Sequence, residues 1–213
     1  MSDFFSNEEY SKLNDLLLIY EWGQKLFMTK MQVMFDSLKI FQNINPIEHI
    51  KARIKTPQDI AGKLKKLNLE ITAENAKKEL NDIIGIRIIC SYAKDIYYLV
   101  DVLKSIPETQ VLTEKDYVSN PKPGGYRSYH IIMKIPVYYS EKTEIIPVEI
   151  QLRTAAMDFW ASLEHKVRYK YKEHIPKHLS NELILCADKI AELDERMFLI
   201  HDIISLINQD SEV

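Results

Sequence analysis

The N-terminal part of the chain has apolar residues at alternating steps of three and four, which is the spacing of one face of an α-helix. The pattern runs from Glu8 to about Phe41, and Gly23 is its one weak point. The pattern predicts a long amphipathic helix over residues 8–41. Its apolar positions are Leu13, Leu17, Tyr20, Phe27, Met31, Met34 and Leu38.

Shorter helices are predicted after this one. A helical segment is expected over about residues 47–53. In "TPQD", Thr56 suits the capping position of a helix, Pro57 its first residue and Asp59 its third, so a helix should begin at Pro57. The stretch "ITAENAKKEL" repeats this capping pattern and predicts another short helix.

The middle of the chain changes to a β-type pattern. The runs "IIGIRIICSY", "VLTEKDYV", "YHIIMKIPVYY" and "IIPVEIQLR" are rich in β-branched and aromatic residues and are bounded by Pro, Gly, Asn and Lys. They predict four or five strands, and "AKDIYYLVDVLKSI" between the first two predicts a helix that crosses over the sheet. The expected fold is α+β, with one mixed sheet flanked by helices.

Helix returns from Thr154, with a break near "HIPKH" and then a final helix over about residues 178–207. The apolar positions of this helix form a seam with heptad spacing: Leu183, Cys186, Ile190, Leu193, Met197, Ile200, Ile204 and Ile207. The seam either packs on the body of its own chain or, together with the helix over 8–41, builds an oligomer. We favour the oligomer.

Composition narrows the class of protein. A chain of 213 residues suits one domain, and its net charge of −3 argues against general binding to nucleic acid or to a membrane surface. Its two cysteines cannot form a disulfide framework, which favours a reducing cytoplasm. The polar, acidic start and the lack of an apolar run near 18 residues predict neither export nor membrane insertion.

Phosphate binding would have to come from side chains. With five glycines and neither of the two common glycine-rich phosphate loops, the backbone does not offer such a site. The run from Lys51 to Lys66 is strongly basic, and Asp59 is its one acid. Within it, Lys63 and Lys66 share a helix face, and Arg53 and Lys55 come just before that helix, so a triphosphate could be bound there. The alternative is a solvated basic face.

Two carboxylates stand out because they interrupt apolar strands. Asp82 precedes "IIGIRIICSY", and Glu149 shares one strand face with Gln151 and Arg153. Carboxylates are the ligands that Mg²⁺ prefers, usually one or two together with substrate phosphates. Arg87, within the apolar strand after Asp82, could stack on a base or pair with a phosphate. Each of these residues could instead lie on the surface of an edge strand.

The stretch "KPGGYRSYH" combines a glycine pair with aromatic and cationic residues. If a strand begins near Tyr126, then Tyr126, Ser128 and His130 share one face, which would suit a flat base with phosphates beside it. Taken alone, the stretch could be a hairpin turn.

Four stretches together resemble the synthetase domain of the RelA/SpoT proteins in its short stand-alone form, the small alarmone synthetases, and are nearest to the RelP-type branch. They are "RIKTPQDIAGKLKK", "DIIGIRIICSY", "KDYVSNPKPGGYRSYH" and "VEIQLRTAAMDFWASLEHKVRYK", within a region from Pro46 to Tyr171. The resemblance implies a nucleotidyltransferase-like sheet, a homotetramer, and transfer of pyrophosphate from ATP to the 3′-hydroxyl of GDP or GTP. The products would be ppGpp or pppGpp and AMP.

The resemblance also implies roles for individual residues. On the ATP side, Arg53 and Arg87 would enclose the adenine, and the phosphates would be held by Lys55, Lys63 and Lys66. Asp82 matches the family's Mg²⁺ ligand, and Glu149 matches the carboxylate that helps to bind the metal and activates the 3′-hydroxyl. On the acceptor side, Tyr126 would stack on guanine, with Gln151 and Asp158 near the base and ribose. The acceptor's phosphates would be held by Lys115, Lys122 and His130.

Two positions depart from the family pattern. Many members have Ser where this chain has Asp59, so a helix-capping role is expected there instead of a phosphate contact. Gly124-Gly125 replaces a more usual Asn-Gly and should preserve the turn. The hydrolase and regulatory domains of long relatives are expected to be absent. A catalytically silent nucleotide- or RNA-binding module, or a nucleotidyltransferase, remains the alternative, although a binding module would not need both Asp82 and Glu149.

Overall fold

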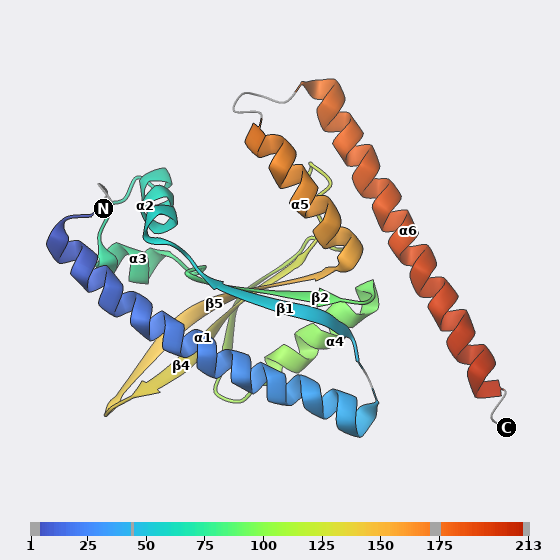
Figure 1. Ribbon diagram of the computed structural model, residues 1–213, viewed down its shortest axis with the longest axis horizontal. Coiled ribbons are helices and arrows are strands. Elements are labelled where there is room, and N and C mark those ends of the chain that lie inside the picture. The colour runs from blue at the N-terminus through green and yellow to red at the C-terminus, as the bar shows by residue number, and fades with distance from the viewer. Residues whose placement is uncertain (1–4, 44, 171–175, 211–213) are drawn as a thin grey trace.

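In the computed structural model, which describes residues 5–43, 45–170 and 176–210, one five-stranded mixed sheet forms the centre of the molecule (Figure 1). The strands are β1 (Ile47–Ile54), β2 (Ile84–Cys90), β3 (Gln110–Asp116), β4 (Tyr129–Tyr139) and β5 (Lys142–Thr154). Their spatial order is β1-β2-β5-β4-β3. Only the central pair, β2 and β5, is parallel. The expected α+β class with a mixed sheet is confirmed.

The strand β1 corrects the helix expected over residues 47–53. Ile47, Ile50 and Ile54 have the three-four spacing of a helix, but the pairing of β1 with β2 shifts register between Ile47 and His49. A bulge adds one residue to a strand and so reverses which face the following side chains occupy. Ile47 therefore packs against the core together with Ile50 and Ile54, and the strand imitates a helical pattern.

The two faces of the sheet differ in character. Helices α1 (Asn7–Gln42) and α4 (Ala93–Lys104) lie on one side, whereas α5 (Ala155–Lys170) and α6 (Lys177–Asp210) lie on the other (Figure 1). The side under α1 and α4 holds the apolar core, including Ile131 and Met133 of β4 and Ile150 of β5. Alternation along the strands turns the neighbouring polar side chains of β4 and β5 to the opposite face. The face of the sheet opposite the core is therefore the one that offers polar side chains for a functional site.

Gly23 of α1 lies where the helix comes closest to the sheet. A methyl group at this position would stand 2.5 Å from Cδ1 of Ile146 and 2.8 Å from Cγ2 of Val137, both of them buried. The weak point in the helical pattern is thus a point of close packing.

Replacing Gly23 by alanine is expected to destabilise the protein by about 1–3 kcal/mol, because overpacking exceeds the gain in helix propensity. Gly62 is the matched control: it lies in α2 (Pro57–Lys66), and a methyl group there would meet no atom of the described residues within 4 Å. Gly62→Ala should raise stability by up to about 1 kcal/mol. Denaturant unfolding would measure both, and stabilisation by Gly23→Ala would contradict the packing account.

Short helices at one end of the sheet begin at capping residues. Thr56 caps α2 by accepting a hydrogen bond from the backbone N–H of Asp59, at 3.2 Å, and Thr56 in turn donates its hydroxyl proton to the Asp59 carboxylate. Thr72 caps α3 (Ala73–Glu79) in the same way. The structure thus gives Asp59 the helix-terminal position expected for it. Among the described residues, no helix is both long and apolar enough to cross a bilayer.

The final helix α6 docks on its own chain with one face and exposes another. The indole N–H of Trp160 donates to the Leu183 carbonyl at 3.0 Å, and the Thr154 hydroxyl donates to the Asp194 carboxylate at 2.7 Å. Of the heptad seam, Leu183 and Ile190 pack on the body. By contrast, the following seam positions are more than half exposed: Leu193, Met197, Ile200 and Ile204. The break expected near "HIPKH" falls partly on residues outside the described ranges.

Candidate active site

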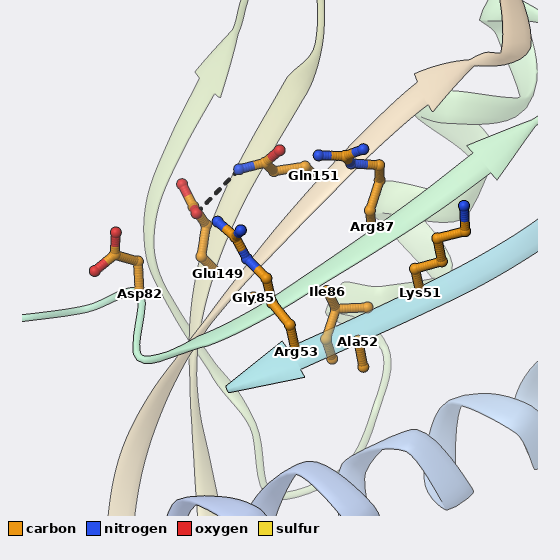
Figure 2. Close-up of a pocket in the computed structure, with 9 residues that line it drawn as sticks. All are labelled: Lys51, Ala52, Arg53, Asp82, Gly85, Ile86, Arg87, Glu149 and Gln151. Carbon is orange, nitrogen blue, oxygen red and sulfur yellow. Dashed lines mark hydrogen bonds between the residues drawn. The ribbon is translucent and has the colours of Figure 1, made fainter. Parts of the chain in front are cut away.

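A pocket of about 430 Å³ opens on the polar face of the sheet, where β1, β2 and β5 lie side by side (Figure 2). The pairing register explains its composition. Lys51 and Arg53 of β1 are the partners of Arg87 and Gly85 of β2, and these in turn are the partners of Gln151 and Glu149 of β5. The side chains of register partners in neighbouring strands point to the same face of the sheet. The cationic side chains of β1 and β2 therefore lie beside the Glu149 carboxylate of β5.

The two arginines expected to enclose adenine both project into this pocket (Figure 2). Arg53 comes from the edge strand β1, and Arg87 from the neighbouring strand β2. Arg87 Nη1 donates to Asp158 Oδ1 at 2.9 Å, while its Nε is buried without a partner among the described residues. Gly85 lies beneath the Arg53 side chain: a Cβ atom at this position would be 3.6 Å from Cγ and Nε of Arg53.

The lysines of the basic run are divided between two environments. Lys55 Nζ and Lys63 Nζ each donate to Asp82 Oδ2 at 2.6 Å, so the structure places both at the expected metal ligand. Lys66, by contrast, is exposed on α2. Burial alone would raise the pKa of the Asp82 carboxyl, but the two lysines outweigh burial and hold the pKa below its ordinary value of 3.8. Asp82 is therefore ionised at neutral pH.

Glu149 is held in place by two neighbours. His130 Nδ1 lies 3.2 Å from its Oε1, and Gln151 Nε2 donates to its Oε2 at 3.1 Å. Burial alone would raise the pKa of the Glu149 carboxyl, and the nearby charge of Asp82 acts in the same direction. The hydrogen bond from His130, the charge of this ring when it is protonated, and the hydrogen bond from Gln151 outweigh these effects and hold the pKa below its ordinary value of 4.5. The carboxylate is thus charged and oriented.

Asp82 and Glu149 are suited to share a divalent cation. Oδ1 of Asp82 is buried and has no hydrogen-bond partner in the described part of the chain, which leaves its lone pairs available. No group of three or more His, Cys, Asp or Glu residues that could hold a metal occurs in that part. Two carboxylates, completed by substrate phosphates and water, are the usual protein contribution to an Mg²⁺ site. The donor set fits Mg²⁺.

The glycine pair of "KPGGYRSYH" forms a turn before β4. The Gly125 N–H donates to the Lys122 carbonyl at 2.8 Å, and Gly125 has a φ of 89°, a conformation that favours glycine. The strand itself begins at Tyr129, later than the expected start near Tyr126. Tyr126 and His130 nevertheless meet, with the hydroxyl 2.8 Å from Nε2. The turn therefore delivers Tyr126 to the polar face.

Two lysines near this turn differ in their contacts: Lys122 lies against aromatic rings, whereas Lys115 is exposed. Lys122 Nζ stands 4.5 Å from the ring centre of Tyr117 and 4.9 Å from that of Tyr126, so its charge covers the two aromatic rings. Lys115 is exposed on β3, where its register partner is His130 of β4. Both cations border the same corner of the sheet as Tyr126.

Comparison with known proteins adds to this geometry. The family described as "Region found in RelA / SpoT proteins" matches residues 52–174. The GTP pyrophosphokinase YwaC of Bacillus subtilis (strain 168) is 43% identical over 181 residues, which cover 85% of this chain and 86% of that protein. The chain belongs to the RelA/SpoT family. A second relative in this family, the GTP pyrophosphokinase YjbM of the same organism, is 33% identical over 72% of this chain and 71% of its own.

Solved structures of small alarmone synthetases share the fold. Small alarmone synthetase 2 from Bacillus subtilis superposes with a TM-score of 0.78 at 41% identity, covering 87% of this chain and 97% of that one. Small alarmone synthetase 1 from the same organism, bound to its product pppGpp, gives a TM-score of 0.79 at 29% identity, covering 89% and 96%. The resemblance inferred from the four sequence stretches is confirmed.

Within this family fold, the structure brings most of the expected site residues together. Arg53, Arg87, Asp82, Glu149 and Gln151 line one pocket. Lys55 and Lys63 join it through Asp82, and His130 through Glu149. Lys66 and Lys115 are exposed and outside the lining of the pocket.

Two residues at this site were not singled out for a role by the sequence. Tyr117 packs edge-on against the rings of Tyr126 and His130, at 6.2 and 5.4 Å between ring centres. Arg153 is buried beneath Tyr126, Gln151 and Asp158 and donates to all three. The strand alternation had placed Arg153 in the polar row with Glu149 and Gln151, and this signal could have identified it.

Proposed function

We propose that this protein is a GTP pyrophosphokinase that transfers pyrophosphate from ATP to the 3′-hydroxyl of GDP or GTP, giving ppGpp or pppGpp and AMP. The observation that carries the proposal is the convergence of Asp82 and Glu149 with Arg53 and Arg87 in one pocket, beside the aromatic corner at Tyr126. The names of the relatives, GTP pyrophosphokinases and small alarmone synthetases, support the same activity.

The proposed transfer forms a bond between the acceptor O3′ and the β-phosphorus of ATP and breaks the bond between that phosphorus and the α,β-bridging oxygen, so that AMP leaves. Glu149, ionised and oriented by His130 and Gln151, takes the proton of the 3′-hydroxyl. The guanidinium groups of Arg53 and Arg87 position the adenine. Reactions of this class depend mainly on positioning and charge neutralisation.

Asp82 and Glu149 would together hold Mg²⁺, which neutralises phosphate charge when bound. Lys55 and Lys63 form ion pairs with Asp82. Their ammonium groups would also bind the phosphates of ATP, which would then lie beside Asp82. Lys66 extends this cationic surface along α2. On the acceptor side, Tyr126 offers a ring for guanine, and Lys115, Lys122 and His130 offer charge and hydrogen bonds for the phosphates.

An assay with labelled ATP, GTP and Mg²⁺ tests the proposal directly. A 3′-pyrophosphorylated guanine nucleotide and AMP are the expected products. Release of pyrophosphate instead of AMP would identify a nucleotidyltransferase, and binding without any product would identify the silent module. Omission of Mg²⁺ should abolish product formation, since two carboxylates facing two phosphate chains need a cation between them.

Tyr126→Ala is expected to lower kcat/KM for GTP by about 100-fold, because stacking of one base on an aromatic ring contributes about 1–3 kcal/mol. KM for ATP should change little, since the adenine pocket lies across Glu149 from this ring. Steady-state kinetics with each nucleotide varied in turn would measure the two effects. An equal loss for both nucleotides would contradict the role of Tyr126 as the acceptor platform.

We also propose a homotetramer located in the cytoplasm, where ATP and GTP are available. The exposed apolar positions of α6 support self-association, because a contiguous apolar seam on a helix is usually buried against a partner. Sedimentation of the wild type and of Ile200→Glu, on that seam, would test this: the variant should dissociate, and a wild-type monomer would refute the assembly.

A further inference from the structure

Arg153 is the one charged residue in the described part of the chain that the fold buries, with 5% of its surface exposed. A buried guanidinium is destabilising unless its N–H groups are paired. Four side chains accept hydrogen bonds from these N–H groups. Ser128 Oγ accepts from Nε at 3.3 Å and Asp158 Oδ1 accepts from Nη1 at 3.0 Å. Gln151 Oε1 and Tyr126 Oη both accept from Nη2, at 2.8 and 2.5 Å.

Two hydrogen-bonded paths lead from Arg153 to Glu149. The first passes through the Tyr126 hydroxyl and His130, whose Nδ1 lies 3.2 Å from Glu149 Oε1. The second passes through Gln151, whose amide Nε2 donates to Glu149 Oε2 at 3.1 Å. The guanidinium thereby holds the Tyr126 ring and, at the far end of both paths, the two oxygens of the Glu149 carboxylate.

The direction of every bond in these paths follows from the groups at their ends. A guanidinium has only donors, and an ionised carboxylate has only acceptors. Glu149 can only accept, so Nδ1 of His130 carries a proton and donates it to the carboxylate. In a neutral ring Nε2 is then an acceptor, and it takes the proton of the Tyr126 hydroxyl, whose oxygen accepts from Arg153. The Gln151 amide is oriented in the same sense, with its oxygen toward Arg153.

A third contact connects this network with the ATP side of the pocket. Asp158 Oδ1 accepts from Arg153 and also from Arg87, at 3.0 and 2.9 Å. Asp158, expected to lie near the acceptor's base and ribose, is thus held between two arginines. The hydrogen bond from Arg87 to Asp158 belongs to neither path to Glu149.

We propose that Arg153 is a positioning residue for the acceptor half of the reaction: through Tyr126 with His130, and through Gln151, it orients the base platform and the Glu149 carboxylate together. This inference rests on the proposed pyrophosphate transfer. Arg153 acts through its neighbours and does not itself take part in bond making. Loss of its forked geometry should therefore affect acceptor use and turnover more than ATP binding.

The tautomer of His130 gives a readout that needs no turnover. In nucleotide-free protein with ¹⁵N-labelled histidine, two-bond ¹H–¹⁵N spectra should show the neutral His130 ring protonated on Nδ1. Arg153→Lys and Tyr126→Phe should each weaken this preference, because the first cannot reach Tyr126 and Gln151 at once and the second lacks the hydroxyl that donates to Nε2. Protonation on Nε2 in the wild type would overturn the network.

Kinetics supply the second readout. Arg153→Lys should lower kcat/KM for GTP by about 10–100-fold while KM for ATP stays within about threefold. Tyr126→Phe keeps the ring, so kcat should fall by about tenfold with KM for GTP within about threefold. Wild-type kinetics together with a wild-type His130 spectrum in either variant would refute the role of Arg153.

Arg127→Lys is the matched control. Its guanidinium donates to the Val118 carbonyl at 3.0 Å and belongs to neither path, so activity and the His130 spectrum should stay as in the wild type. If Arg153→Lys does not fold, Tyr126→Phe, which leaves the buried charge in place, decides the question. A wild type that makes no product but shows the Nδ1–H tautomer would refute the proposed function and leave the network standing.

Discussion

Glu149→Gln is expected to reduce pyrophosphate transfer by about 10³-fold, the scale of losing a general base and part of a charge site. Glutamine keeps the size of the side chain but removes its negative charge and its capacity to take the proton of the 3′-hydroxyl. It also places an amide opposite the donors of His130 and Gln151. Initial rates of formation of labelled pppGpp at saturating ATP and GTP would measure the loss.

Glu144→Gln provides the control on the same strand. Glu144 belongs to β5 but pairs with Lys77 at 2.9 Å, outside the pocket, so its replacement should leave the rate within about twofold. Equal rates in Glu149→Gln and the wild type would show that another group accepts the proton and that the assignment of Glu149 is wrong.

Asp82→Asn is expected to reduce activity by at least about 10³-fold, because one of the two carboxylates available to Mg²⁺ loses its charge. The change should also lower the free energy of unfolding by about 1–3 kcal/mol, because Lys55 and Lys63 lose their shared partner. The activity assay and denaturant unfolding measure the two effects separately. Asp59→Asn, an equal chemical change at the exposed start of α2, should alter neither by much.

The effect of Asp82→Asn on stability should depend on pH. The folded-state pKa of Asp82 lies below its ordinary value of 3.8, so its carboxylate stabilises the fold above that pH. The stabilisation is lost as pH falls through the lowered folded-state value. The stability difference between the wild type and Asp82→Asn should therefore shrink as the pH is lowered below 3.8. A difference that persists in acid would mean that size or packing, and not charge, causes it.

Local patterns predicted most of the elements, since helix and strand periods are properties of neighbouring residues. The long first helix, the capped helix from Pro57, the crossover helix and four strands were all foreseen. The edge strand β1 was not, because a bulge at its start gave three isoleucines a helical spacing. Only its pairing with β2 shows that the segment is extended.

The candidate site was predicted where a charged residue interrupts an apolar strand. Asp82, Arg87 and Glu149 were recognised in this way, and the structure places all three at one pocket. The convergence of Lys55 and Lys63 on Asp82 was not foreseen, because it depends on how α2 and β1 approach the start of β2. The contacts of Arg153 could not be predicted from the sequence either, because they join distant segments. Tyr126 and Ser128 come from the turn before β4, and Asp158 comes from α5.

The sequence by itself determined the α+β class, the family and the residue types of the site, because periodicity and motifs are written in short stretches of chain. The tertiary structure decided that the polar face of β5 meets the turn at Gly125, that Tyr126 reaches Glu149 through His130, and that one buried arginine holds both. These contacts depend on strand register and on packing between distant segments, for which a single sequence carries no local signal.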